Sequence, residues 1–368
     1  MRIEQIDLYH LRMPLQSPFE TSFGRVEERE CILIALRADG VTGYGECVAD
    51  AAPGYAYETT GTAWHILRDF LVPAVLGQDI ASAEDLQQRL RHVRGHPMAK
   101  AGLELALWDA LGKATGQSLR QMLGGVRDRV EVGVSVGIQA SPEALVKTVE
   151  GYLAQGYRRV KIKIKPGRDI AEARAVRAAF PDLRLQVDAN SAYTLETADA
   201  LLPLDDLGLL LIEQPLAEDD LWDHAQLQRR FRTPICLDES ILSARHARQA
   251  IEMGACRVIN IKPGRVGGLS QAVAIHDLSQ QHGVPVWCGG MLETGVGRAA
   301  NLALASLPGF TLPGDISATD RYYAQDITQE RFVLNEDSTI TVPDGPGLGV
   351  TLDEGALERF TVARITLP

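Results

Sequence analysis

Five charged residues recur along the middle of the chain at almost constant intervals. Lys163, Asp188, Glu213 and Asp238 follow one another every 25 residues, and Lys262 follows after 24. An interval of this length is that of one strand and one helix. We therefore expect these side chains at corresponding heights on five successive strands of a parallel sheet, at the end where barrel active sites lie.

The three acids predict a metal site. Carboxylates of Asp188, Glu213 and Asp238 that converge in one place cannot all stay ionised without a cation among them. Oxygen ligands favour a hard divalent ion such as Mg²⁺, for which Mn²⁺ or another divalent ion could substitute. The alternative is that each acid caps the helix that follows it. Three acids in register between two lysines favour the metal site.

The lysines predict proton transfer. Strands that carry Lys163 and Lys262 would face each other across a closed barrel, so a substrate at the metal would have an amine on either side. A general base needs a pKa near ~7 to 8 rather than the ~10.4 of a free lysine. Lys161 shares a strand face with Lys163. We expect its charge to lower the pKa of Lys163 and to attract a substrate anion.

Other charged residues lie close to these in sequence. Arg265 could lower the pKa of Lys262, although an exposed arginine at a helix start explains it equally well. We expect Glu239, next to Asp238, and Arg265 to shift the pKa values of the site residues without contacting the substrate themselves. Lys165 lies past its strand end and is best interpreted as a solvated loop lysine.

The elements that position these residues begin near residue 130. From there, eight short apolar segments, from VEVGVSVGI to FTLPGD, alternate with amphipathic helical patterns such as SARHARQAIEMG, which ends in a helix-stopping glycine. This alternation predicts parallel βα units and an α/β fold of the (β/α)₈ barrel type, or TIM barrel. A doubly wound open sheet is the rival, but no GxGxxG follows the first strand.

Residues 1–125 have a different pattern, that of an α+β domain. The segments IEQIDLYHLRM and ECILIALRADGVTGYGE have the pattern of antiparallel strands with a turn at Asp39-Gly40, and helical patterns follow around residues 56–75, 82–94 and 98–116. The division that we expect is a capping domain at 1–125, a barrel at 126–325, and a segment at 326–368 that returns to the capping domain.

Composition excludes several classes of function. The chain has 368 residues with a net charge of −11, which repels nucleic acids and anionic membranes. Its five cysteines are scattered and never spaced as CxxC, so neither a disulfide framework nor a thiolate zinc site is predicted. Glu4 and Asp7 interrupt the apolar core that a signal peptide needs, and no apolar run approaches a membrane span. We expect a cytoplasmic protein.

Motifs spread over essentially the whole chain carry a resemblance to a known family. They are the Lys161-x-Lys163 pair, the three acids and Lys262, within the wider segments PFETSFG, YRRVKIKIKPG, VDANSAYTL, IEQPL, PICLDES, NIKPGRVGG, PVWCGGMLETGVGRAAN and LPGD. They resemble the muconate-lactonizing branch of the enolase superfamily, and within it the o-succinylbenzoate synthase / N-succinylamino acid racemase (N-acylamino acid racemase) subfamily.

The resemblance implies a modified (β/α)₇β barrel under an α+β capping domain, a small-molecule carboxylate substrate and a homo-oligomer. It also implies abstraction of the proton α to a carboxylate, with Mg²⁺ stabilising an enediolate. In a synthase reaction Lys163 would remove the proton and assist loss of water while Lys262 stays cationic. In a racemase reaction the two lysines would alternate as acid and base.

Substrate-binding residues follow from the same resemblance. They would be Lys161, Ser135, Asn190, Gly289, Gly290 and Met291 on the barrel, with Phe19, Phe23 and Tyr55 on loops of the capping domain. Asn190 would also support the metal ligands. The loops would close over the substrate and exclude water. For Tyr55, simple packing under a neighbouring turn is an equally good explanation.

Other activities compete with this interpretation. A mandelate racemase-like enzyme would carry Lys-x-His on the second strand, where this chain has Lys161-x-Lys163. A dipeptide epimerase would carry Asp-x-Asp on the last strand, where this chain has Asp315 and Ser317. Muconate cycloisomerisation stays open on the same residues. Outside the superfamily, a metal-free Schiff-base lyase could use one of the lysines. A non-catalytic binding protein would need neither lysine.

Overall fold

The computed structural model describes all residues 1–368. Its N-terminal part is built on an antiparallel sheet of four strands in the order β13-β1-β2-β3. The strands are β1 (Ile3–Thr21), β2 (Gly24–Ala38), β3 (Val41–Cys47) and β13 (Thr361–Leu367). The predicted turn joins β2 and β3, where Asp39 and Gly40 both have positive φ, at 48° and 80°.

Helices cover one face of this sheet. They are α1 (Thr60–Ile66), a π-helical turn (Leu67–Leu71), α2 (Val72–Val75), α3 (Ala83–Leu90), α4 (Pro97–Thr115) and α5 (Leu119–Leu123). Helix α4 lies so close to β3 that a Cβ on Gly43 or Gly45 would come within 2.0 Å of a helix carbonyl oxygen. Glycines at these two positions therefore let the helix dock on the sheet.

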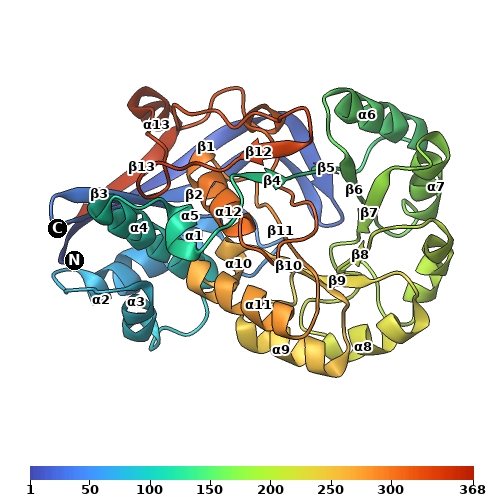
Figure 1. Ribbon diagram of the computed structural model, residues 1–368, viewed down its shortest axis with the longest axis horizontal. Coiled ribbons are helices and arrows are strands. Elements are labelled where there is room, and N and C mark those ends of the chain that lie inside the picture. The colour runs from blue at the N-terminus through green and yellow to red at the C-terminus, as the bar shows by residue number, and fades with distance from the viewer.

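Seven parallel strands form the second part of the molecule, in the order β5 to β11. They are β5 (Val134–Val136), β6 (Arg159–Lys163), β7 (Arg184–Asp188), β8 (Ile212–Glu213), β9 (Ile235–Leu237), β10 (Val258–Ile261) and β11 (Val286–Cys288). Figure 1 shows the helices of this part around the strands, from the right of the view to its centre. In chain order they are α6 (Pro142–Ala154), α7 (Ile170–Ala179), the 3₁₀ helix Ala198–Asp206, α8 (Leu221–Arg230), α9 (Ala244–Met253), α10 (Pro263–Val266), α11 (Leu269–Gln281) and α12 (Gly295–Ala305).

The FTLPGD segment completes the barrel. Phe310 forms a parallel bridge with Val286 of β11, and Gly314 forms one with Val132. On the two sides of this segment, Asp315 N donates to Cys288 O at 2.9 Å and Gly133 N donates to Gly314 O at 2.8 Å. The eighth predicted strand thus joins the last strand of the sheet to the first, and the α/β barrel fold is confirmed.

The segment after the barrel crosses to the antiparallel sheet. Within it, β12 (Thr339–Thr341) pairs with β4 (Arg129–Glu131), and α13 (Glu354–Phe360) precedes β13. β13 pairs antiparallel with β1, with Ile6 opposite Leu367. The exact domain boundaries stay a prediction.

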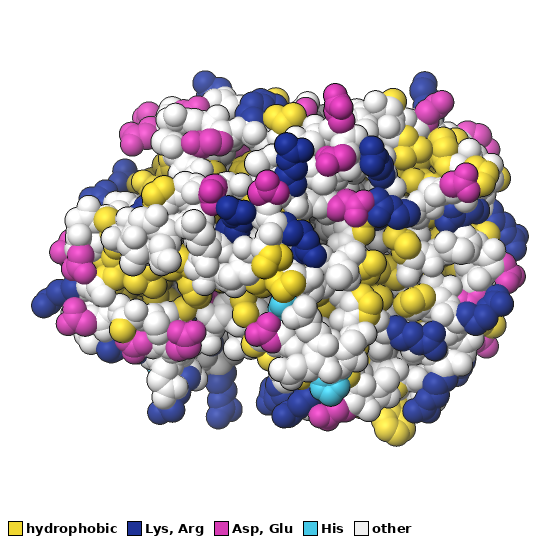
Figure 2. Space-filling view, viewed as in Figure 1, with side chains coloured by type: hydrophobic (Ala, Val, Ile, Leu, Met, Phe, Trp, Pro, Cys, Tyr) yellow, Lys and Arg dark blue, Asp and Glu magenta, His cyan; other side chains and the backbone are white.

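Other expectations concern cysteines and membranes. All five cysteines are buried and free, which agrees with their interpretation as small apolar side chains. No helix has the length and apolar character needed to cross a membrane. On the face in Figure 2, basic and acidic side chains are interspersed over most of the surface.

The buried carboxylate of Glu104 should make the stability of the fold depend on pH. This α4 carboxylate is 1% exposed and accepts hydrogen bonds from Ser270 N at 3.3 Å and Gln87 Nε2 at 3.2 Å, while burial raises its pKa to about 7. Between its ordinary pKa and that value, the folded state holds a proton that the unfolded chain has lost. The free energy of unfolding must therefore fall as pH rises through this range.

Urea unfolding of the Glu104→Gln variant at pH 5 and pH 8 measures this contribution. We expect the variant to lose less stability than the wild type over that interval, by up to about 3 kcal/mol. Glu252→Gln, which changes an exposed helix carboxylate, is the control. Equal losses in the wild type and the Glu104→Gln variant would contradict the expectation.

Candidate active site

The five regularly spaced residues all lie at the same end of the barrel strands. Lys163 pairs with Asp188, and Asp188 with Glu213, in the strand register. Glu213 is opposite Cys236, so Asp238 lies two residues beyond its level. Because a shift of two residues keeps a side chain on the same face, Asp238 still points into the barrel mouth. The stagger of the barrel therefore preserves the predicted convergence.

The acids do not cap helices. The side chains that cap α8 and α9 are those of Asp220 and Ser243, which accept hydrogen bonds from the first turns of these helices. Asp188, Glu213 and Asp238 are all 0% exposed and bond instead to lysines of the barrel interior. The capping explanation is therefore wrong.

Lys161 lies at the centre of the charged network. Its Nζ is 2.6 Å from Asp315 Oδ2, 2.9 Å from Glu213 Oε2 and 3.2 Å from Asp188 Oδ2. Burial alone would lower the pKa of Lys161, but these three carboxylates outweigh it and raise that pKa well above its ordinary value. The ammonium is thus a fixed positive charge. That it lowers the pKa of Lys163 stays a prediction.

Lys163 lies at the edge of this network and faces a cavity. Its Nζ is 2.6 Å from Asp188 Oδ2 and 2.8 Å from Asn190 Oδ1. Asn190 has a left-handed backbone, with φ at 42°, and its Nδ2 donates to Glu239 Oε1 at 2.9 Å. Strain of this kind is common where a loop holds a side chain in one orientation at a functional site. Asn190 therefore orients both Lys163 and Glu239.

Lys262 lies on the other side of the acids, beside Asp238. Its Nζ is 2.8 Å from Asp238 Oδ2 and donates to Tyr55 Oη at 3.1 Å. The Tyr55 hydroxyl in turn donates to Asp238 Oδ1 at 2.9 Å, so this loop side chain does more than pack under a turn. Burial lowers the pKa of Lys262, but Asp238 outweighs it and raises that pKa above its ordinary value.

The structure decides between the two explanations of Arg265. The side chain is 1% exposed, forms an ion pair with Asp238 and donates to Asn260 O at 2.6 Å. The exposed alternative is therefore wrong. Lys165 is half-exposed as expected, and its Nζ lies 3.3 Å from Glu20 Oε1 of the capping domain.

One cavity of about 80 Å³ brings the predicted residues together. Lys161, Lys163 and Lys262 all line it. Every residue expected to bind substrate also lines this cavity, apart from Gly289, namely Ser135, Asn190, Gly290, Met291, Phe19, Phe23 and Tyr55. Their roles toward a substrate stay predictions.

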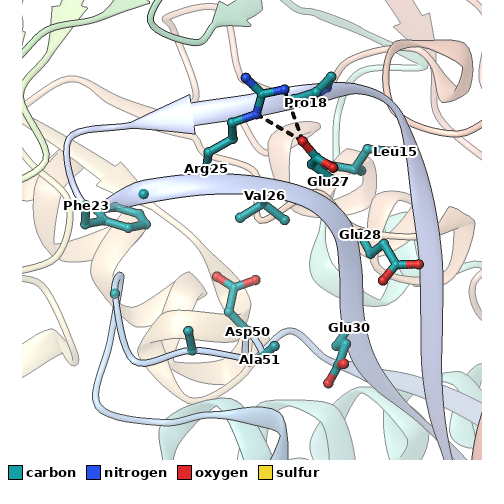
Figure 3. Close-up of a pocket in the computed structure, with 13 residues that line it drawn as sticks. Leu15, Pro18, Phe23, Arg25, Val26, Glu27, Glu28, Glu30, Asp50 and Ala51 are labelled. Atoms are coloured by element: carbon teal, nitrogen blue, oxygen red, sulfur yellow. Dashed lines mark hydrogen bonds and ion pairs between the residues drawn. The ribbon is translucent and has the colours of Figure 1, made fainter.

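A larger hollow of about 840 Å³ adjoins this cavity on the outside. Phe23, Val26 and Asp50 line both spaces and form the partition between them. Figure 3 shows Phe23 and Val26 on the strand side of the hollow and Asp50 facing them from the next loop. The chain around Phe23 and the loop that carries Asp50 therefore lie between this cavity and the outer hollow.

The three acids have the chemistry of a divalent-cation site. Burial, followed by repulsion from Asp188, raises the pKa of Glu213 to about 7, because its carboxylate lies away from water and close to another acid. In this conformation each of the three carboxylates forms an ion pair with a lysine ammonium group. No three acidic side chains converge on one point. The donor set of buried oxygen ligands fits the ion, which would compete with the lysines for the same oxygens.

Sequence reasoning missed two polar residues of the barrel interior. Asn260 Nδ2 donates to Glu213 Oε1 at 2.8 Å, and Asp315 binds both Lys161 and Arg159, each at 2.6 Å. Asn260 is two residues before Lys262, so the alternation of strand faces could have found it. Asp315 lies more than 150 residues after Arg159 and Lys161, so strand and helix patterns do not connect it with them.

Comparison with known proteins agrees with this arrangement. Residues 144–356 match the family described as "Enolase C-terminal domain-like", and residues 4–124 match "Mandelate racemase / muconate lactonizing enzyme, N-terminal domain". The chain belongs to the enolase superfamily. Membership in this superfamily of enzymes implies a divalent metal ion.

Relatives in the superfamily cover nearly the whole chain. The o-succinylbenzoate synthase of Geobacillus stearothermophilus is 52% identical over 98% of this chain and 96% of its own. The N-succinylamino acid racemase of an Amycolatopsis species is 51% identical over 99% of both chains. A crystal structure of an enolase superfamily member from Listeria innocua has a TM-score of 0.96 and 43% identity, over 100% of this chain and 99% of that one.

Proposed function

We propose that this chain removes the proton α to a carboxylate, as an o-succinylbenzoate synthase, an N-succinylamino acid racemase, or both. The observation that carries the proposal is that Lys163 and Lys262 line one cavity, with three buried carboxylates between their strands. Relatives with both names are about half identical to this chain, which supports the same constellation for both reactions.

Each residue has a distinct part in this proposal. Lys163 takes the α-proton, and Lys262 acts on the opposite side of the substrate, as a stabilising cation in the synthase reaction and as the second acid or base in the racemase reaction. Lys161, held by its carboxylates as a permanent cation, attracts the substrate carboxylate. Asp315 is already bound by Lys161 and Arg159, so it is not free to hold a substrate amino group.

Asp188, Glu213 and Asp238 are the proposed ligands of the metal, which we take to be Mg²⁺, with Mn²⁺ as a substitute. When bound, the ion would offset the negative charge that develops on the substrate as the α-proton leaves. Asn190, Glu239 and Arg265 keep the carboxylates and lysines in place around it. That the protein is cytoplasmic and assembles as a homo-oligomer stays a prediction.

Turnover of the two substrate types tests the proposal. The purified protein with Mg²⁺ should dehydrate 2-succinyl-6-hydroxy-2,4-cyclohexadiene-1-carboxylate, racemise N-succinylamino acids, or do both. Ultraviolet absorbance follows the first reaction and polarimetry the second. If neither substrate is converted and neither exchanges its α-proton in D₂O, the proposal is wrong.

Removal of divalent ions should abolish both reactions. We expect activity to fall by about 10²-fold or more after chelation and dialysis, because the charge on the developing dianion is then no longer offset. Mg²⁺ or Mn²⁺ should restore it, whereas Na⁺ at equal ionic strength should not. Full activity in the chelated protein, together with trapping of substrate by borohydride, would instead favour the Schiff-base lyase.

A further inference from the structure

Glu46 belongs to the antiparallel sheet of the capping domain, but its side chain bonds to the barrel. It lies near the end of β3 and is 3% exposed. Its carboxylate accepts hydrogen bonds from Thr294 Oγ1 at 2.6 Å, Thr294 N at 3.2 Å and Gly297 N at 3.0 Å. A capping-domain residue thus holds the first turn of α12.

The turn that Glu46 holds is continuous with a wall of the catalytic cavity. Thr294 caps α12, and the preceding residues Gly290, Met291 and Leu292 line the cavity. Leu292 has a left-handed backbone, with φ at 58°. Only Glu293 therefore separates the three lining residues from the cap of α12.

Glu293 makes this connection rigid. Its Oε2 accepts from Met291 N at 2.8 Å, and its Oε1 accepts from Asn301 Nδ2 of α12 at 2.8 Å. The backbone of Met291 is therefore tied to the helix through one side chain. A displacement of the first turn of α12 would move Met291 with it.

Glycine at position 297 allows Glu46 to approach the helix. A Cβ there would come within 2.8 Å of Glu46 Oε2 and 2.7 Å of Glu293 Cγ. Real Cβ atoms do not come so close to other atoms, so an alanine at this position would displace the Glu46 carboxylate or the turn that it holds.

The carboxylate of Glu46 is buried without a lysine or arginine hydrogen-bond partner. Burial raises the pKa of Glu46 to about 7, so its ionised form destabilises the fold at neutral pH and above. Its hydrogen bonds come from backbone and hydroxyl groups and not from lysine or arginine.

We propose that Glu46 is a positioning residue, which fixes the loop 289–293 from the capping domain and so sets the shape of the substrate cavity. Glu46 does not itself line that cavity. The inference rests on the proposed function in one respect, that the substrate occupies this cavity.

Kinetics of Glu46→Ala, Glu46→Gln and Gly297→Ala test the role. For the Glu46→Ala and Gly297→Ala variants we expect the KM for an N-succinylamino acid to rise roughly tenfold, while kcat changes by less than about threefold, because the wall contacts the substrate and not the reacting atoms. Glu46→Gln keeps an acceptor for Thr294 Oγ1 and should recover most of the wild-type KM. Amide hydrogen exchange over residues 289–297 should be faster in the Glu46→Ala and Gly297→Ala variants.

Glu104→Ala is the matched control. Glu104 is also a buried carboxylate that joins the capping domain to a barrel helix, but it bonds to Ser270 on α11 and not to the loop. Its loss should lower stability and leave KM unchanged. If Glu46→Ala and Gly297→Ala raise KM no more than Glu104→Ala does, and the 289–297 amides exchange as in the wild type, Glu46 has only a structural role and the inference is wrong.

The two readouts separate this inference from the proposed function. If the wild-type protein converts neither substrate, the proposed function fails, and amide exchange over 289–297 with Mg²⁺ alone still decides whether Glu46 fixes the loop. If Glu46→Ala does not fold, Gly297→Ala and Glu46→Gln supply the same two measurements.

Discussion

Replacing Lys163 by alanine is expected to abolish exchange of the substrate α-proton with solvent, and both synthase and racemase turnover with it. Lys163 Nζ lies at the cavity, next to Asp188 and Asn190, and no other amine on β6 can replace it, because Lys161 is held by three carboxylates. Loss of a general base lowers rates by about 10² to 10⁴-fold. Proton NMR of an N-succinylamino acid in D₂O measures the exchange directly.

Lys165 supplies the control for this substitution. It is two residues further along the chain and half-exposed, with an ion pair to Glu20. Lys165→Ala removes the same number of atoms and the same charge, and should keep exchange within about threefold of the wild type. Exchange that persists at the wild-type rate in Lys163→Ala would show that another group takes the proton.

Replacing Lys262 by alanine should abolish racemisation and leave exchange on one face of the substrate. One enantiomer of an N-succinylamino acid would still present its α-proton to Lys163, while the other would lose its base. We expect net racemisation to fall by about 10²-fold or more. The measurement is exchange in D₂O that starts from each pure enantiomer, with chiral chromatography to follow inversion.

The comparison of the two enantiomers makes the Lys262 experiment decisive. Loss of exchange from both enantiomers would mean that Lys262 holds the site together instead of acting on one face. Wild-type racemisation would refute the assignment of two bases. Lys100→Ala, which changes a partly buried lysine of the capping domain, controls for the loss of a cation.

The sequence predicted the parts of this site that depend on periodicity. The intervals of 25 residues placed Lys163, Asp188 and Glu213 in register, because each strand and helix unit adds the same number of residues. The closure of the barrel by FTLPGD followed from the same alternation. Strand faces and unit length are local properties, so one sequence is enough to infer them.

Contacts across the barrel could not be predicted in the same way. Arg265 is buried against Asp238, although its place at a helix start suited an exposed residue as well. Lys161 forms an ion pair with Asp315, which is 154 residues away in sequence. The two side chains meet only because the barrel closes. Glu46 meets Thr294 only because the capping domain docks on the barrel. These partners depend on tertiary geometry, which strand and helix patterns do not encode.

The hydroxyl of Tyr55 has a consequence for the timing of turnover. It comes from a loop over the cavity and bonds to both Asp238 and Lys262, while the cavity beneath it is only about 80 Å³. A substrate larger than this cavity would need the loop to move away, and such a movement would break both bonds. If the loop must move in each turnover, the rate of this movement would set an upper limit on the rate of the catalytic cycle.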